Sequence, residues 1–237
     1  MDYRDSEIGA THDYFWFEAK DGLVDVLMRK QKTQGTPKIL NLGAGTGSDI
    51  RILNRFGRVY VVDVDERALE LIPKELVAEK KACDACAMPY PNGFFDKVVA
   101  FDVLEHIEND QKAISEIHRV LKRDGVLIFT VPAFHFLYSA HDKALNHFRR
   151  YDRRTLEGYL SSFKRLEVGY WVFSLFLPIA FFRLMKRNDP IPKVGFIHFP
   201  RAVDRFFFYL LKAENWLIGQ GLRLPFGVTL YGIYRKP

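Results

Sequence analysis

The feature that most constrains this chain is a glycine-rich turn, Gly43-Ala44-Gly45-Thr46-Gly47, between an apolar stretch and a helix-like one. Residues 38–42 are typical of a strand, and residues 49–56 carry apolar side chains at helical spacing. Glycine lets the backbone turn tightly and approach a ligand closely, and the start of a helix offers N–H groups that have no partner within the helix. The segment therefore predicts a ligand-binding strand–turn–helix unit.

The alternation of strands and helices continues along the first half of the chain. We predict strands at 59–64, 97–101 and 126–131, and helices at 66–71 and 109–121. The predicted strands are apolar on both faces, as buried parallel strands are. The pattern indicates an α/β fold in which a doubly wound, mostly parallel sheet is covered by helices on both sides.

An acidic residue, Asp63, ends the second predicted strand, 20 residues after Gly43. In a doubly wound sheet such a carboxylate reaches the crevice at the carboxyl ends of the strands, where it can accept hydrogen bonds from two ribose hydroxyls. The turn and the acid together predict a site for an adenosine-containing cofactor. The G-x-G-x-G spacing of the turn differs from the G-x-G-x-x-G fingerprint of dinucleotide sites.

Several segments, in order over residues 36–133, resemble the class I S-adenosylmethionine-dependent methyltransferases, and in particular their type 11/12-like subgroup. They are residues 39–47, 61–65, 83–85, 94–107 and 121–128. The resemblance implies a Rossmann-like, doubly wound, mostly parallel seven-stranded sheet. It also implies S-adenosyl-L-methionine as cofactor and S-adenosyl-L-homocysteine as product.

The same resemblance implies which residues bind the cofactor. Residues 14–20 are similar to an aromatic segment that folds over the cofactor in one subgroup. In that subgroup a basic residue like Lys20 pairs with the methionine carboxylate. The alternative is that residues 14–20 form a helix that packs its aromatic side chains on the sheet. Asn41 stands where the family usually has Glu or Asp, so that an amide oxygen would meet the methionine amino group. The cofactor-binding residues that we expect are Trp16, Lys20, Asn41, Gly43, Ala44, Gly45, Gly47, Asp63, Val64, Asp84, Ala85, Phe101 and Val103.

The segment from His141 to Tyr151 resembles a H-D-x4-H-x-R-R-Y pattern of methyltransferases that act in glycan and polyprenyl-lipid pathways. A hydroxyl acceptor benefits from a general base. The predicted catalytic residues are His141 or His147 as that base and Asp142 as its orienting partner. The predicted substrate-binding residues are Arg149, Arg150 and Tyr151, since arginines bind phosphate and carboxylate through paired hydrogen bonds. The alternative is a loop–helix junction in which Asp142 caps a helix and the arginines form salt bridges. We predict no metal site.

The last part of the chain is basic and aromatic. Residues 131–237 hold 17 Lys and Arg against 7 Asp and Glu, and 14 of the 21 phenylalanines. The apolar run at 171–182 is too short to span a bilayer core of roughly 30 Å. Burial against the sheet edge, a dimer interface and shallow contact with a membrane surface all remain open for it. We expect four regions: an N-terminal helical lid at 1–35, the cofactor-binding core at 36–133, a helical aromatic and basic substrate cap at 134–225, and a final edge strand at 226–237.

These features together predict an enzyme, an S-adenosylmethionine-dependent methyltransferase that methylates an oxygen of a small-molecule or lipid-linked acceptor. The alternatives are an RNA methyltransferase, which the absence of a recognisable nucleic-acid module disfavours, and an inactive cofactor-binding partner subunit. Two cysteines and a polar, charged beginning predict a cytoplasmic protein, in contact with the inner face of the membrane if the cap is membrane-facing. The sequence does not predict an oligomeric state.

Overall fold

The computed structural model describes residues 14–31, 33, 35–189 and 199–237. The described residues form a seven-stranded sheet in the order β3-β2-β1-β4-β5-β7-β6. Its strands are β1 Lys38–Leu42, β2 Arg58–Asp63, β3 Glu79–Ala82, β4 Phe95–Phe101, β5 Leu121–Pro132, β6 Lys164–Trp171 and β7 Thr229–Arg235. The helices are α2 Phe15–Arg29, α3 Ile50–Leu53, α4 Glu66–Glu70, α5 Asp110–Val120, α6 Ala140–Ala144, α7 Arg153–Tyr159, α8 Phe176–Met185 and α9 Arg201–Gly219, with short 3-10 turns η1 Lys74–Leu76, η2 Leu104–His106 and η3 His135–Leu137.

The sheet is mostly parallel, as predicted. Strands β1, β2, β3, β4 and β5 run parallel to one another, and β7 pairs antiparallel with both β5 and β6. Our prediction that residues 226–237 form an edge strand is wrong. Strand β7 lies inside the sheet, because β6 pairs along its open side and becomes the edge instead.

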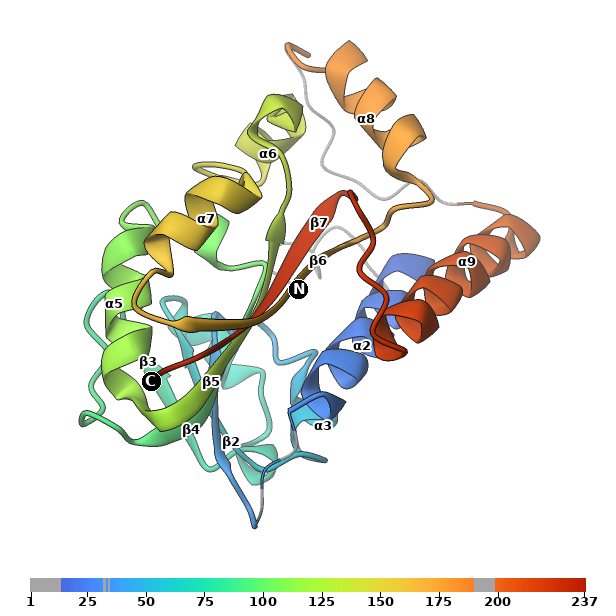
Figure 1. Ribbon diagram of the computed structural model, residues 1–237. Helices are drawn as coiled ribbons and strands as arrows, with labels where there is room; N and C mark the ends of the chain where they lie inside the picture. Colours follow the sequence, from blue (N-terminus) through green and yellow to red (C-terminus); the bar gives the residue numbers. More distant parts are fainter. Residues whose placement is uncertain (1–13, 32, 34, 190–198) are drawn as a thin grey trace.

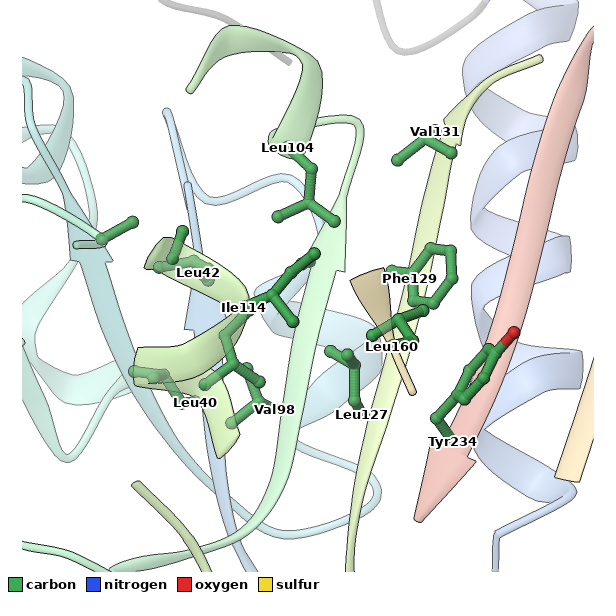
Figure 2. Packing of buried hydrophobic residues seen from close by; sticks show 14 of the residues in the cluster. Leu40, Leu42, Val98, Leu104, Ile114, Leu127, Phe129, Val131, Leu160 and Tyr234 are labelled. Atoms are coloured by element: carbon green, nitrogen blue, oxygen red, sulfur yellow. The ribbon is translucent and has the colours of Figure 1, made fainter. Parts of the chain in front are cut away.

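Helices cover both faces of the sheet, which confirms the doubly wound arrangement (Figure 1). Figure 2 shows one of the two cores, in which Leu40, Val98 and Leu127 of the central strands pack against Ile114 of α5. The second core lies on the opposite face. There α2, α3 and α9 bury their apolar side chains against β1, β2 and β4.

Helices α2 and α9 come from the two ends of the chain and pack side by side (Figure 1). Asn215 of α9 donates a hydrogen bond of 2.7 Å from its Nδ2 to the Ala19 carbonyl of α2. A Cβ at Gly22 would lie only 2.8 Å from the same Asn215 nitrogen, so that glycine permits the close approach. The N-terminal helix is therefore fixed on the sheet by the C-terminal one.

The segment predicted as a helical cap, residues 134–225, is not helical throughout. It supplies the edge strand β6 between α7 and α8. Trp171 is the last residue of that strand, although the apolar run at 171–182 suggested that it begins a helical segment. The reason is that residues 164–171 pair with β7 along their length. Among the described residues, no helix is both long and apolar enough to cross a membrane.

Candidate active site

The predicted glycine turn follows β1 directly, at the edge of the sheet where the parallel strands end. Gly43, Gly45 and Gly47 have φ angles of 68°, 50° and 83°, in the left-handed region that favours glycine. The Gly43 and Ala44 amides donate to the Val62 carbonyl at the end of β2, at 2.9 and 3.2 Å. This geometry ties the turn to the neighbouring strand and explains why the segment needs its glycines.

The predicted ribose-binding acid, Asp63, ends β2 beside this turn and is partly exposed. Its Oδ2 accepts a hydrogen bond of 2.8 Å from the Gly45 amide, and its Oδ1 accepts one of 3.0 Å from the Asp65 amide. Each carboxylate oxygen can accept more than one hydrogen bond, so both remain able to receive a ribose hydroxyl. Asp63 therefore both fixes the turn and presents an acceptor pair at the edge of the sheet.

The surroundings of the turn fit the predicted cofactor. A Cβ at Gly43 would overlap the Val103 side chain, so Val103 packs directly against the turn and this position requires glycine. Asn41 is buried, and its Nδ2 has no hydrogen-bond partner among the described residues. This nitrogen is a hydrogen-bond donor, which suits the carboxylate of the methionine end of the cofactor and not its amino group. Val64, next to Asp63, keeps 76% of its surface exposed, which leaves an apolar side chain open to an adenosine.

The other predicted cofactor residues lie near the same sheet edge or support it. Asp84 accepts a hydrogen bond from the Cys86 amide at 2.8 Å, and Ala85 is buried beside it. Phe101 ends β4 and is buried in the core on the α2 face. Trp16 packs on Trp171 of β6 with ring centroids 5.4 Å apart. This contact agrees with the alternative for residues 14–20, a helix that packs its aromatic side chains on the sheet.

Lys20 of α2 has a partner that sequence reasoning missed. Its Nζ donates to Asp102 Oδ2 at 2.6 Å, and the Thr130 hydroxyl donates to Asp102 Oδ1 at 2.8 Å. Burial disfavours the charged form of Lys20, but Asp102 and Asp49 outweigh it and raise the pKa to about 12. Asp102 has a φ of 49°, directly after β4. An acidic residue ending a predicted parallel strand, like Asp63, was the signal that could have identified it.

The segment from His141 to Tyr151 surrounds one buried carboxylate, Asp142, which is fully excluded from solvent. Its Oδ1 accepts from Arg150 Nε at 2.8 Å and pairs with His147 Nδ1 at 3.3 Å. Its Oδ2 accepts from Arg183 of α8 at 3.0 Å and from the Ser139 amide at 2.9 Å. These positive neighbours outweigh the burial of Asp142 and hold the pKa of its carboxyl well below the usual range.

Arg150 and Tyr151 are not available to a substrate, so these two predictions are wrong. Both are buried: Arg150 also donates to the Ala133 carbonyl, and the Tyr151 hydroxyl donates to Asp110 at 2.8 Å. Arg149 is partly exposed but pairs with Asp110 at 2.8 Å and donates to the Glu108 carbonyl. The alternative that the arginines form internal salt bridges therefore describes Arg149 and Arg150. The contacts of Arg149 and Tyr151 with residues 108–110 hold this segment against the start of α5.

The two candidate bases differ in their surroundings. Burial and the nearby Arg183 lower the pKa of His141 to about 4, so at neutral pH it is a weak proton acceptor. His147 is the histidine that contacts Asp142, and its ring meets that of His106 edge-on with centroids 4.6 Å apart. The geometry therefore pairs the predicted orienting carboxylate with His147.

Next to His147 lie two side chains, Glu105 and His106, to which the sequence analysis assigned no role. Glu105, His106 and His147 each offer one ligand atom, and these atoms lie within 4.8 Å of one another. Burial and the nearby Asp102 raise the pKa of Glu105. Glu105 and His147 lie close together because the Phe148 amide donates a hydrogen bond of 2.8 Å to the Glu105 carbonyl. No local sequence pattern predicts this contact between distant parts of the chain.

Comparison with known proteins covers mainly the cofactor half. Residues 40–129 match a family described as "Methyltransferase domain". An uncharacterized protein of Methanocaldococcus jannaschii is 30% identical over 109 residues, 46% of this chain and 46% of that protein. The ubiquinone/menaquinone biosynthesis C-methyltransferase UbiE of Burkholderia vietnamiensis is 32% identical over 97 residues, 37% of this chain and 40% of that protein.

Solved structures extend the likeness to nearly the whole chain. The cyclase SpnF has a TM-score of 0.63 at 21% identity, covering 94% of this chain and 83% of its own, which shows the fold alone. The matched stretches span less than half the length of the curated relatives named above. The matched residues 40–129 hold the glycine turn and Asp63 at the end of β2, so the cofactor-binding part of the chain is similar to methyltransferase domains.

Proposed function

We propose that this chain transfers the methyl group of S-adenosylmethionine to an oxygen of a small-molecule or lipid-linked acceptor. The observation that carries the proposal is the position of Asp142, which contacts the candidate base His147 on one side and Arg183 of the apolar helix α8 on the other. The buried Asp142 carboxylate thus connects the proposed proton acceptor, His147, to α8, whose exposed apolar side chains suit a lipid.

The cofactor end of the reaction rests on residues of the turn and of the strand ends. S-adenosylmethionine supplies a methyl group on a sulfonium sulfur, which is already a strong electrophile. Gly43 and Gly45 bring the backbone close to the ligand, and Asp63 accepts the ribose hydroxyls. The Lys20–Asp102 pair holds α2 against the end of β4, where the methionine end of the ligand would lie. Fixed orientation of this kind supplies much of the rate in a displacement reaction.

The acceptor end rests on His147. Its Nδ1 points to Asp142, so its Nε2 is the nitrogen left to take the proton of an acceptor hydroxyl. Asp142 stays ionised because Arg150 and Arg183 surround it, and it therefore stabilises the imidazolium that forms. The low pKa of His141 supports the choice of His147 as the base.

A lipid-linked acceptor is supported by α8. Leu177 and Phe181 of this helix are 73% and 68% exposed, and the exposed Lys186 and Arg187 follow its last residue, Met185. Figure 1 shows α8 standing away from the sheet, next to α6. An exposed apolar helix with basic neighbours suits an anionic membrane surface, so we place the chain at the cytoplasmic, inner face of the membrane. The basic C-terminal part is what suggests RNA as the alternative acceptor, but the sequence holds no recognisable nucleic-acid module, which disfavours it.

The test is transfer of labelled methyl groups from S-adenosylmethionine by the purified chain. The acceptors are a polyprenyl-linked glycan in anionic vesicles, the same glycan on a short water-soluble tail, phenols and bulk RNA. We expect transfer to oxygen on the lipid-linked acceptor. His147→Gln should lower kcat by about 10²- to 10⁴-fold, the usual contribution of a general base, and should leave binding of S-adenosylmethionine unchanged.

Matched variants separate the parts of the proposal. His141→Gln should keep most of the activity; if it loses as much as His147→Gln, the base assignment is wrong. The double change Leu177→Ser and Phe181→Ser should impair only the vesicle-bound acceptor, with Trp216→Ser on α9, which is exposed to a similar degree, as control. Methyl transfer to RNA or to carbon, or no turnover of any acceptor, would contradict the proposed reaction.

A further inference from the structure

Three side chains at the carboxyl end of β4 converge without a role in cofactor binding. They are Glu105 and His106 of η2, and His147, which follows α6. Their ligand atoms, one from each residue, lie within 4.8 Å of one another. Two imidazoles and one carboxylate are the donor set of many catalytic sites for zinc and related ions.

Glu105 provides an observation independent of this clustering. The residue is 1% exposed, and its Oε2 accepts no hydrogen bond from the described residues. Burying a carboxylate oxygen without a partner costs free energy, so such groups are normally paired or bound to a metal. Lys20, the nearby lysine of α2, donates instead to Asp102. A bound cation would supply the missing partner.

His147 is already arranged as metal-binding histidines are. Its Nδ1 lies 3.3 Å from Asp142 Oδ1, and that carboxylate is fixed by Arg150 and Arg183. A hydrogen bond from the far ring nitrogen to a carboxylate orients a histidine ligand and makes it a better donor. The Tyr138 hydroxyl also holds the His147 carbonyl, at 2.8 Å, so that both the ring and the backbone of this residue are positioned.

We propose that Glu105, His106 and His147 bind one divalent ion of the zinc class, leaving a further coordination position open. Around a tetrahedral zinc with bonds of about 2.1 Å, ligand atoms lie about 3.4 Å apart. The three side chains need to close by little more than an ångström to reach this geometry.

The ion's role, unlike its binding, rests on the proposed function. The open position would bind the acceptor oxygen, and the ion would lower the pKa of its hydroxyl so that the proton leaves to water. The oxygen would then form its bond to the methyl carbon as the carbon–sulfur bond breaks. In the ion-bound chain His147 is a ligand and not the proton acceptor. Glu105 distinguishes the two mechanisms, because base catalysis by His147 does not use it.

The binding test uses the full chain without a histidine tag, stripped with a chelator and titrated with Zn²⁺ and, separately, with Co²⁺. We expect one ion per chain and intense visible Co²⁺ bands typical of tetrahedral nitrogen and oxygen ligation. Glu105→Gln and His106→Gln should each weaken binding at least 100-fold. Glu108→Gln is the matched control, because Glu108 is exposed and only its backbone carbonyl is used, by Arg149. Binding of S-adenosylmethionine by all three variants shows that they are folded.

The outcomes separate this proposal from the proposed function. No binding at one ion per chain, or equal binding by Glu105→Gln and the wild type, would overturn the metal site. If that ion-free chain still methylates its acceptor, the function and the His147 base stand. Binding that depends on Glu105 and His106 supports the site even if no acceptor is turned over, in which case it is the proposed reaction that fails.

Discussion

Replacing Asp142 with asparagine tests the central ion network of the acceptor side. The carboxylate accepts from Arg150, Arg183 and the Ser139 amide, and the Arg150 side chain is only 2% exposed while that of Arg183 is 15% exposed. An asparagine amide keeps one acceptor oxygen but turns a donor nitrogen toward other donors, and two guanidinium groups remain without a counter-charge. Removing one member of a buried pair costs about 3–5 kcal/mol.

The lower end of this range is expected, because Arg183 can turn to solvent. For a chain of this length, each kcal/mol shifts the melting temperature by about 2–4 °C, so Asp142→Asn should lower it by roughly 6–12 °C. Urea unfolding followed by circular dichroism measures the free energy directly. Asp152→Asn is the control, because Asp152 is exposed at the start of α7.

A second measurement tests whether Asp142 also holds α8. Trypsin cleaves after arginine and lysine, and α8 contains Arg183 with Lys186 directly after it. Cleavage there should be faster in Asp142→Asn than in the wild type, since the Asp142–Arg183 pair is lost. A stability loss below about 1 kcal/mol, or an equal loss for Asp152→Asn, would refute the reasoning that this carboxylate is indispensable to the buried arginines.

Two further changes address the cofactor side. Asp63→Asn should lower the affinity for S-adenosylmethionine, measured by calorimetry, by about 10²-fold, because the hydrogen bonds from ribose lose a charged acceptor. Asp65→Asn should leave the affinity unchanged, because the Asp65 side chain accepts hydrogen bonds from Arg67 in the first turn of α4; equal losses would contradict the ribose assignment. Lys20→Met should lower the free energy of unfolding at pH 7, and the difference from the wild type should shrink toward pH 3. Lys20 and Thr130 outweigh burial and lower the pKa of Asp102. The ionised Asp102 therefore stabilises the fold above the unfolded pKa of 3.8, and this stabilisation is lost as the pH falls. Urea midpoints at the two pH values measure this, and a difference independent of pH would refute it.

The part of the fold that the sequence predicted depends on local patterns. The apolar stretch at 38–42 and the run ending at Asp63 are β1 and β2, since buried parallel strands are apolar on both faces. The position of β7 was not predictable in this way. The alternation of side chains in residues 227–234 suits an edge strand equally well. Strand β7 lies inside the sheet only because residues 164–171, about 65 residues earlier in the chain, pair with it.

The same distinction holds within the site. Gly43 and Asp63 are joined by two neighbouring strands, so spacing alone was enough to bring them together. Arg150 was predicted to bind substrate because an arginine pair in a loop suits an anion. Its burial depends on Asp142 and on the Ala133 carbonyl, and neither a charge count nor a motif reports burial.

The acceptor side is thus built by contacts between distant segments, and this affects how function can be inferred for such chains. Asp142 joins His147 to Arg183 of α8, and Phe148 joins this segment to Glu105. A change in α8 can therefore alter the acceptor side without touching the glycine turn, while the family match ends at residue 129, before any of α6, α7 or α8. Relatives that share residues 40–129 can share the cofactor and differ in acceptor, so the acceptor of this chain has to be identified with the whole chain, α8 included.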